Sequence, residues 1–411
     1  MKGQSLSLLT TLGWRNLWRH PRRTFVILFA IILGVWFMII SAGMMIGIVE
    51  QQLKDTIFNL TGHAQIHNKK FRDDPAIEHS MSAASKELLA ELNSKDVIKW
   101  SSRIRLPAVV TSERESRGVT LLGIDPDREQ GLSFIGKPVV AGRALESIDD
   151  KGIIIGRRMA EKLETRIGKR IVIMMQDKNN EVADRGFRIV GLYQAELEAT
   201  ELAYVFVGLK TAQKLLDIGN DISEISLLTH SREGLDPLVT NLRVAAPDLE
   251  SMSWQELEPL VVLTMEFYEA FMIYWYLIIF AAMGIGLTNT MLMAVFERTR
   301  EIGLLQALGM RPRYIVGQVL METLILLVIG VAMGNLLGWF TTDVILANGI
   351  DLSAFAKGTE QFNMSSTMML TLRTNDLMQI NILVILLGLL ASLYPAIKAA
   401  RYIPVEAITR T

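Results

Sequence analysis

Four long apolar stretches interrupt the otherwise mixed pattern of the chain. They are residues 24–49, 270–296, 314–342 and 377–397; the third carries one charge, Glu322, and the others carry none. A helix needs roughly 20 apolar residues to cross a hydrocarbon core of about 30 Å, because its backbone groups must be satisfied internally there. The sequence therefore predicts an α-helical membrane protein with four transmembrane helices, at residues 24–49, 268–296, 314–346 and 377–399.

The polar segments between these stretches complete the predicted layout. Residues 1–23 form a cytoplasmic or interfacial elbow helix, and the first span is a retained anchor, because its apolar run is far longer than that of a signal peptide. Residues 50–267 form a large extracytoplasmic α/β domain with two lobes, the middle lobe inserted into the outer one. The remaining segments are a short helix at 297–313, an outer loop at 347–376 and a cytoplasmic tail at 400–411.

Within residues 50–267, alternation of apolar and polar positions predicts strands. The expected strands are residues 63–67, 97–110, 152–155, 170–175, 185–193 and 203–207. Helical spacing of apolar residues predicts helices at 83–92, 157–164, 209–216 and 232–245. The mixture indicates an α/β domain.

The short loops carry unequal charge. Residues 1–23 hold five basic residues and no acid, and residues 297–313 hold four arginines against two glutamates. The outer loop at 347–376 holds two basic and three acidic residues. The positive-inside rule therefore predicts that both termini are cytoplasmic and that residues 50–267 lie outside, in the periplasm of a bacterial inner membrane.

Composition excludes several classes of protein. Half of the residues are hydrophobic, and 42 Lys and Arg nearly balance 43 Asp and Glu, which argues against a nucleic-acid binder with a basic face. The absence of cysteine excludes disulfides, thiolate metal sites and thiol nucleophiles. We expect no catalytic residue, no metal and no cofactor bound directly by this chain.

Two sequence patterns resemble ligand sites and are interpreted as ordinary structure. Residues 131–137 spell G-x-x-x-x-G-K, but Pro138 stands where a phosphate-binding loop needs a hydroxyl, so we predict a turn. His63 and His67 share a face if their segment is a strand, and two imidazoles there would make half of a metal site. With no third ligand nearby in sequence, we interpret them as solvated strand residues.

Small residues and one acid mark the faces where the spans pack. Small residues four apart let helices approach closely, and they occur at Gly43, Gly47, Gly330, Gly334 and Gly338. Packing within one subunit is the expected use of these faces, with dimerisation as the alternative. Glu322 lies about 13 Å beyond Arg313 along the third span, where a carboxylate costs up to about 2.5–3.5 kcal/mol. It should face protein and form a structural hydrogen bond rather than relay protons.

Residues 297–310, ERTREIGLLQALGM, change from charged to apolar on the cytoplasmic side. Ile302, Leu305 and Leu308 follow one another in steps of three, Gly309 favours a left-handed stop, and Pro312 begins the next helix. An apolar stripe among arginines indicates a docking surface. The alternative is an amphipathic connector lying on lipid headgroups.

At these residues the chain resembles the FtsX/MacB-type permeases of the type VII ABC transporter superfamily. The resemblance includes the E-R-x-x-E-I-G-x-L-x-A-L-G pattern of residues 297–309 and the glycine-rich helix that carries Glu322. It continues in the tail, at Pro395-Ala396, Ala399-Ala400-Arg401 and Pro404-Val405-Glu406-Ala407. Residues 142–143, 152–156 and 187–193 are similar to the periplasmic core domain of the family, although Gly168-Lys169 replaces a Gly-Asp common there.

The resemblance implies a non-catalytic permease subunit that pairs with a second copy or a homologue and binds a cytoplasmic ABC ATPase dimer. ATP and magnesium would be held by that partner. The conformational changes of the ATPase would be transmitted to the periplasmic domain, which is mechanotransmission. The residues implied in ATPase coupling are Glu297, Arg298, Arg300, Glu301, Ile302, Leu304, Leu305, Leu308 and Gly309. Ile302, Leu305 and Leu308 are expected to seat the coupling helix.

Residues 62–67 and 351–369 are more similar to the lipoprotein-releasing LolC/LolE branch than to the MacB efflux branch, whose members carry an N-terminal ATPase. The expected cargo is therefore a lipoprotein or another hydrophobic envelope molecule. The alternatives are efflux with a periplasmic adaptor, FtsX-like signalling to a cell-wall hydrolase, and a membrane-anchored enzyme.

Overall fold

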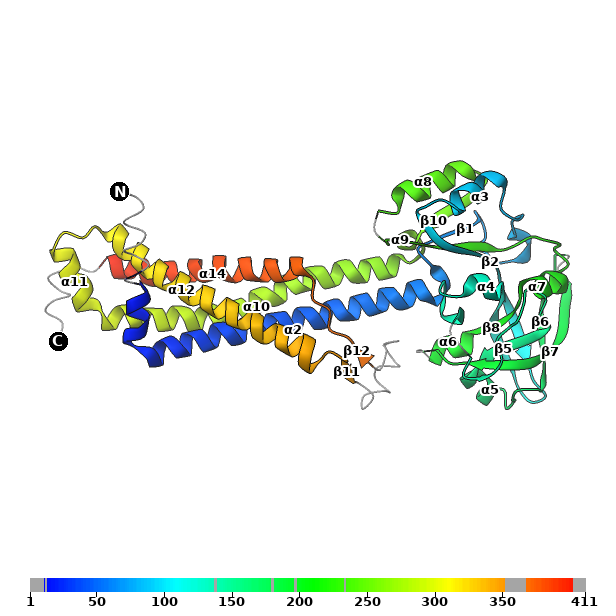
Figure 1. Cartoon of the computed structure of the whole chain (residues 1–411), viewed down its shortest axis with the longest axis horizontal. Coiled ribbons are helices and arrows are strands. Elements are labelled where there is room, and N and C mark those ends of the chain that lie inside the picture. Colours follow the sequence, from blue (N-terminus) through cyan, green and yellow to red (C-terminus); the bar gives the residue numbers. More distant parts are fainter. Residues whose placement is uncertain are drawn as a thin grey trace. The chain divides into compact units, whose positions relative to one another are not determined.

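A computed structural model describes residue 11 and residues 13–136, 139–178, 181–195, 198–232, 234–351 and 367–401. The chain divides into two units. Unit 1 comprises Met1–Glu50, Met265–Asp351 and Thr367–Thr411, and unit 2 comprises Gln51–Thr264 and Leu352–Ser366. Figure 1 shows the elements of both.

Four long helices form most of unit 1 and lie side by side in Figure 1. They are α2 (Pro21–Thr56), α10 (Pro259–Glu297), α12 (Pro312–Trp339) and α14 (Thr374–Ala400), and α12 continues into the π-helical turn η4 (Phe340–Ile345). All four are long and apolar enough to cross a membrane. The helices are longer than the predicted spans, because helical hydrogen bonding continues past the apolar run into polar sequence. The one exception is the third span, whose predicted end lies one residue beyond the end of η4.

The helices of unit 1 pack through large aliphatic side chains. Ile31, Val35 and Ile39 repeat every four residues along α2, so they form one buried stripe. They share a cluster with Leu327 of α12 and Val384 of α14. α10 is the least covered of the four, with 17% of its most apolar window buried, against 39% for α2.

One mixed sheet runs through unit 2. Its order is β10-β1-β9-β2-β3-β8-β5-β7-β4, with β6 paired to β2 and β7. The pairs β3/β8 and β5/β7 are parallel and the others are antiparallel. The strands are β1 (Ala64–Asn68), β2 (Val97–Thr111), β3 (Ser116–Ile124), β4 (Ala141–Gly142), β5 (Gly152–Gly156), β6 (Arg170–Gln176), β7 (Val182–Tyr193), β8 (Tyr204–Gly208), β9 (Glu224–Thr229) and β10 (Leu249–Ser253).

Strand β2 belongs to both parts of this sheet. Its residues 97–103 pair with β9, and its residues 104–111 pair with β3. Strands β1, β9 and β10 form the outer part of the sheet. In the chain, strands β3 to β8 are inserted between β1 and the pair β9 and β10. The two predicted lobes share one strand and belong to a single unit.

Short helices connect the strands. They are α3 (Lys86–Leu92), α4 (Pro126–Glu129), α5 (Arg157–Lys162), α6 (Glu198–Ala203), α7 (Leu209–Leu216), α8 (Asp236–Ala245) and α9 (Trp254–Leu257), with single turns η1 (Ile57–Thr61), η2 (Ile77–His79) and η3 (Phe134–Gly136). The sequence pattern does not predict β3, β4, β9 or β10. Strand β9 is buried at every position, so it lacks the alternation by which a half-exposed strand is recognised.

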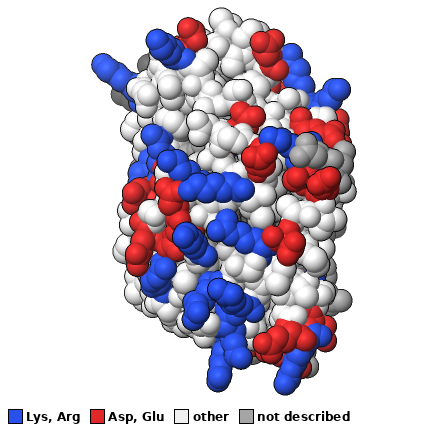
Figure 2. Space-filling view, turned by 90° about the vertical axis from the view of Figure 1, so that its right-hand side faces the viewer, with Lys and Arg blue, Asp and Glu red and all other residues white. Residues whose placement is uncertain are grey.

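The surface of unit 2 mixes charges of both signs. In the face that Figure 2 shows, Lys and Arg side chains alternate with Asp and Glu side chains instead of gathering in one patch. Among the ion pairs of unit 2, the pair of Arg143 and Asp150 is bidentate, with Nη1–Oδ2 and Nη2–Oδ1 distances of 2.6 and 3.2 Å. Burial alone would raise the pKa of Asp150, but Arg143 and two backbone N–H groups lower it to about 2.

Candidate functional site

The segment between α10 and α12 folds as a short helix, α11 (Thr299–Ala307). Gly309 follows it with a φ of +93°, in the left-handed region that glycine adopts without strain. Pro312 then lies in the first turn of α12. The predicted end of one helix at Gly309 and the predicted start of the next at Pro312 are both confirmed.

One side of α11 is exposed. Successive residues of a helix are about 100° apart, which places Arg300, Leu304 and Leu308 within about 80° of one another. All three are exposed, Leu304 by 55% and Leu308 by 77%. Glu301 and Ala307 are exposed beside them. Helix α11 therefore presents an apolar pair between charged residues, named here the α11 face: Arg300, Glu301, Leu304, Ala307 and Leu308.

The stripe predicted from Ile302, Leu305 and Leu308 is wrong as a single docking face. Three residues turn a helix by about 300°, so the stripe rotates by about 60° at each step. Ile302 consequently points into the subunit, 9% exposed, against Val295 of α10 and Ala399 of α14. Leu305 is half-buried and Leu308 is exposed. Ile302 anchors α11, and Leu304 and Leu308 are its exposed apolar residues.

A buried ion pair fixes the corner where α10 ends. Arg298 Nη1 lies 3.1 Å from both carboxylate oxygens of Glu322, and both residues are less than 10% exposed. Asn16 Nδ2 donates to Glu322 Oε1 at 2.6 Å, and Gln318 Nε2 lies 3.4 Å from the same atom. Glu322 therefore faces protein. Arg298, expected among the charges that orient the coupling helix toward its partner, is instead buried as the counter-ion of Glu322.

Two outer ion pairs connect the same corner to the N-terminal segment, whose residues 13–19 are helical, and to the first turn of α2. Arg19 Nη1 lies 2.7 Å from Glu301 Oε1, and Arg23 Nη1 lies 2.8 Å from Glu297 Oε2. The Arg19–Glu301 pair is at least half exposed on both sides. Exposed pairs of this kind contribute at most about 1 kcal/mol. The buried Arg298–Glu322 pair is therefore the stronger restraint on α11.

We expect Glu322→Gln to destabilise this corner by about 1–3 kcal/mol, because the guanidinium of Arg298 keeps its burial and loses its counter-charge. α11 should then be cut faster by trypsin at exposed Arg300 in the detergent-solubilised chain. The matched control is Glu301→Gln, which breaks an exposed pair on the same helix and should leave the cleavage rate nearly unchanged. Equal rates for the two variants would contradict the assigned role of Glu322.

Three glycines of α12 face α2 of the same subunit. A Cβ added at Gly330, Gly334 or Gly338 would lie 2.4, 2.7 or 2.8 Å from side-chain atoms of Ile31, Val35 and Ile39. These distances are shorter than real Cβ contacts, so the close approach of the two helices requires glycine. On α2, a Cβ at Gly43 would lie 3.3 Å from Leu372, and one at Gly47 would lie 1.8 Å from the carbonyl oxygen of Met369. These faces are thus covered within the subunit.

A second candidate site, which the sequence pattern does not predict, lies in unit 2 where η1 follows α2. The carbonyl oxygen of Leu60 accepts from Arg103 Nη1 at 2.5 Å and from Gln65 Nε2 at 3.2 Å. Leu60 has a φ of +89°, a strained value for a residue with a side chain. At Gly62, also at positive φ, a Cβ would lie 2.5 Å from Ser226 Oγ. We name Leu60, Gly62, Gln65, Arg103 and Ser226 the stalk junction.

Arg103 connects this junction to the rest of unit 2. Its side chain is fully buried, and its Nε and Nη2 atoms lie 2.6 and 2.9 Å from the two carboxylate oxygens of Glu129 on α4. Burial opposes the charge of Arg103, yet the carboxylates of Glu129 and Glu224 outweigh it and raise its pKa. The pKa of Glu129 is lowered in turn, because Arg103 outweighs the burial of that carboxyl. Both groups therefore stay ionised in the interior.

His63 and His67 have different surroundings. His67 lies in β1 between β9 and β10 and is 2% exposed, so its interpretation as a solvated residue is wrong. His63 precedes β1, is half-buried, and its Nδ1 lies 2.8 Å from Thr229 Oγ1. Among the described residues, no group of three or more His, Cys, Asp or Glu could hold a metal ion.

Several predicted features lie wholly or partly outside the described residues. These are residues 1–10, the 352–366 part of the outer loop, the Pro404–Ala407 motif, and Lys137 and Pro138 of the loop-like motif. Gly131, the described start of that motif, lies two residues after the end of α4 and has a φ of +76°. This is the backbone geometry of a turn, as predicted.

Comparison with known families gives two matches that together cover most of the chain. Residues 24–245 match the MacB-like periplasmic core domain, and residues 273–404 match the FtsX-like permease C-terminal domain. A lipoprotein-releasing system transmembrane protein, LolC of Neisseria meningitidis serogroup B, is 21% identical over 94% of this chain and 93% of its own length. A macrolide export ATP-binding/permease protein, MacB of Nitrobacter winogradskyi, is 36% identical over 31% of this chain. The chain spans 17% of that second relative.

Two solved structures are similar to part of the chain. One is the extracellular domain of the noncanonical ABC-type transporter YknZ from Gram-positive bacteria, with 15% identity, 46% of this chain covered and a TM-score of 0.34. The other is the periplasmic region of MacB from Actinobacillus actinomycetemcomitans, with 13% identity, 51% of this chain covered and a TM-score of 0.35. Each of those chains is covered over 98% of its length.

Proposed function

Since the chain belongs to the family with the MacB-like periplasmic core domain and is the transmembrane subunit of an ABC transporter, we propose that it relays the motion of a separate ATPase. In this proposal an ATPase dimer binds the α11 face, and ATP and magnesium are held by that partner. A second copy of the chain or a homologue completes the permease. The chain itself is a non-catalytic subunit that converts nucleotide-driven movement into work outside the membrane.

The observation that carries the proposal is the contrast between the two sides of α11. Its inner side is fixed by Ile302 and by the buried Arg298–Glu322 pair. Its outer side leaves Leu304 and Leu308 exposed. A helix whose buried side is anchored to the spans, and whose exposed side offers apolar residues to a partner, would transmit movement of a bound protein to those spans. A connector resting on headgroups would not need such an anchor.

Orientation follows from the same proposal. The α11 face must be cytoplasmic to meet an ATPase, which agrees with the arginines of residues 297–313 and 1–23 and the positive-inside rule. Because one span separates residues 1–23 from unit 2, unit 2 then lies in the periplasm. The stalk junction would receive the movement there, through the end of α2.

For the cargo, we propose a lipoprotein or another hydrophobic molecule of the envelope. The support is the match along almost the whole length of a lipoprotein-releasing transmembrane protein. Efflux with a periplasmic adaptor is the second candidate, supported by a match of higher identity but smaller coverage to a macrolide export protein. FtsX-like signalling to a cell-wall hydrolase stays a further alternative, because the permease domain is shared.

Affinity purification of the chain from native membranes in mild detergent tests the proposal. Mass spectrometry should identify a nucleotide-hydrolysing ABC subunit and a second permease, and addition of ATP should release lipid-anchored protein from the complex. Recovery of an adaptor protein would favour efflux, and recovery of a hydrolase would favour signalling. A purified intact assembly without any ATPase would refute the proposed function.

A further inference from the structure

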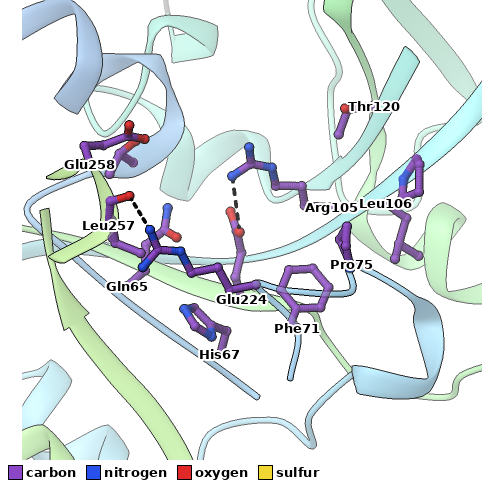
Figure 3. A pocket seen from close by; sticks show the side chains of 13 residues that line it. Gln65, His67, Phe71, Pro75, Arg105, Leu106, Thr120, Glu224, Leu257 and Glu258 are labelled. Atoms are coloured by element: carbon purple, nitrogen blue, oxygen red, sulfur yellow. Dashed lines mark hydrogen bonds and ion pairs between the residues drawn. The ribbon is translucent and has the colours of Figure 1, made fainter. Parts of the chain in front are cut away.

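A cavity of about 310 Å³ lies in unit 2 between β1, β9 and the second half of β2. His67 and Glu224 lie at its floor, both 2% exposed or less, whereas Arg72 and Arg105 lie nearer its mouth. Phe71 and Leu106 line its sides (Figure 3). This volume is at the lower end of the range for ligand pockets. It admits a short segment of a larger molecule.

The free nitrogen of His67 is a hydrogen-bond acceptor in the neutral ring. Nδ1 lies 3.0 Å from the carbonyl oxygen of Asn68, and a carbonyl only accepts, so Nδ1 carries the hydrogen. Nε2 therefore presents a lone pair, and it has no hydrogen-bond partner among the described residues. A buried acceptor of this kind costs free energy unless a donor reaches it.

Glu224 supplies a second unsatisfied acceptor beside the first. His67 and Glu224 are directly paired across β1 and β9, so their side chains lie on the same face of the sheet. Glu224 Oε1 is buried and has no hydrogen-bond partner among the described residues. Its nearest cation there is Arg103, whose Nη1 lies 3.6 Å away, too far for a hydrogen bond. The floor of the cavity thus offers two adjacent acceptors.

The charges around these acceptors exclude a cation as the fitting donor. Arg103 and Arg105 both face the carboxylate of Glu224, at 3.6 and 3.8 Å, and would repel a metal ion or an ammonium group. A metal would also need a third protein ligand, and none is placed for it among the described residues. The fitting donors are uncharged N–H or O–H groups.

We propose that this cavity, the His67 pocket, binds a short extended peptide segment. Backbone N–H groups of the peptide donate to His67 Nε2 and Glu224 Oε1, and its carbonyl groups accept from Arg105 at the mouth. An apolar side chain fits against Leu106, Pro75 and Leu257. A sugar would also bring hydroxyl donors, but it needs an open aromatic face, and Phe71 is only 5% exposed.

The His67 pocket and the stalk junction share one residue, Gln65. Gln65 lines the pocket and also donates to the carbonyl oxygen of Leu60, within the stalk junction. A bound peptide therefore contacts the network that receives the end of α2. The inference rests on the proposed function for its meaning, because it identifies the polypeptide part of a lipid-anchored cargo as the bound class.

Calorimetric titration of the full chain in nanodiscs, without ATPase, tests the pocket. The probe is the uncharged pentapeptide N-acetyl-Ser-Leu-Ser-Leu-Ser-amide, and zinc chloride and maltose are the comparison ligands. Saturable peptide binding is expected, and His67→Phe and Thr120→Trp should each weaken it at least about tenfold, since the first removes an acceptor and the second fills the pocket. Thr111→Trp, on the same sheet but outside the pocket, should change it by less than about twofold.

Each contrary result overturns the inference. Absence of saturable peptide binding refutes it, and equal affinity in all variants assigns the two acceptors to bridging water. Binding of zinc or maltose that Thr120→Trp abolishes assigns the pocket to another ligand class. If His67→Phe fails to fold, the difference in peptide affinity between Thr120→Trp and Thr111→Trp decides whether the pocket binds the peptide. These outcomes are independent of ATPase co-purification, so the pocket can fail while the proposed function stands.

Discussion

Arg103→Met is expected to weaken unit 2 by about 3–5 kcal/mol, a large fraction of the stability of an ordinary domain. The methionine fills most of the arginine volume but leaves the carboxylate of Glu129, 1% exposed, without its counter-ion. It also removes the 2.5 Å hydrogen bond to the Leu60 carbonyl. The loss combines an uncompensated buried charge with an unsatisfied acceptor at a strained residue.

Peptide-resolved hydrogen exchange of the full chain measures this effect. Amides of β2 and β9 should exchange about a hundred to a few thousand times faster in the variant, by conversion of the expected free energy. The control is Arg105→Met, two residues along the same strand, which breaks only a 3.8 Å contact from a partly exposed side chain. It should cost at most about 1 kcal/mol.

A double variant separates the charge from the packing. In Arg103→Met with Glu129→Leu, both buried charges are replaced by apolar groups, so protection should recover well beyond that of the single variant. Unchanged exchange in Arg103→Met would show that Arg103 does not hold the stalk junction. No recovery in the double variant would assign the loss to the Leu60 contact instead of to Glu129.

The features that sequence predicts well here are local. A run of more than 20 apolar residues predicts a span whatever surrounds it, and all four spans were predicted. Gly309 and Pro312 predict the end of one helix and the start of the next by backbone geometry alone. Glu322 was placed in protein because a carboxylate in an apolar helix requires a partner.

The features that sequence misplaced depend on tertiary neighbours. Helix α11 is amphipathic, but the pattern of apolar residues does not tell which of them face its own subunit. Val295 and Ala399, which cover Ile302, come from helices distant in the sequence. The pattern therefore assigns all of the apolar residues of α11 to a partner, whereas Ile302 packs inside its own subunit.

Arg103 and His67 were missed for a related reason. Alternating polar residues in a strand usually face solvent, so the pattern places His67 on an exposed surface and does not single out Arg103. Around Arg103 that face is covered by η1 and α4, and Arg103 is neutralised by Glu129, 26 residues away. Only the fold brings these groups together. A buried polar face without a local signal can be recognised only in the structure.

Replacing both Leu304 and Leu308 by aspartate is expected to abolish co-purification of the ATPase. The two side chains form the exposed apolar part of the α11 face. If they fill a groove of the partner, each is a central contact whose loss costs at least about 2 kcal/mol, or roughly thirtyfold in affinity. Together the substitutions would weaken the complex about a thousandfold, beyond recovery in a wash.

The matched control for this result is Val244→Asp, because Val244 in unit 2 is exposed by 77%, the same value as Leu308. It places the same charge on an apolar residue of equal exposure and should leave the ATPase bound. Ile302→Asp should act differently, lowering the amount of folded chain, because it buries a charge against Val295 and Ile315. Retention of ATPase by the double variant, with insertion and folding intact, would move the contact away from α11 and remove the basis of the proposed relay.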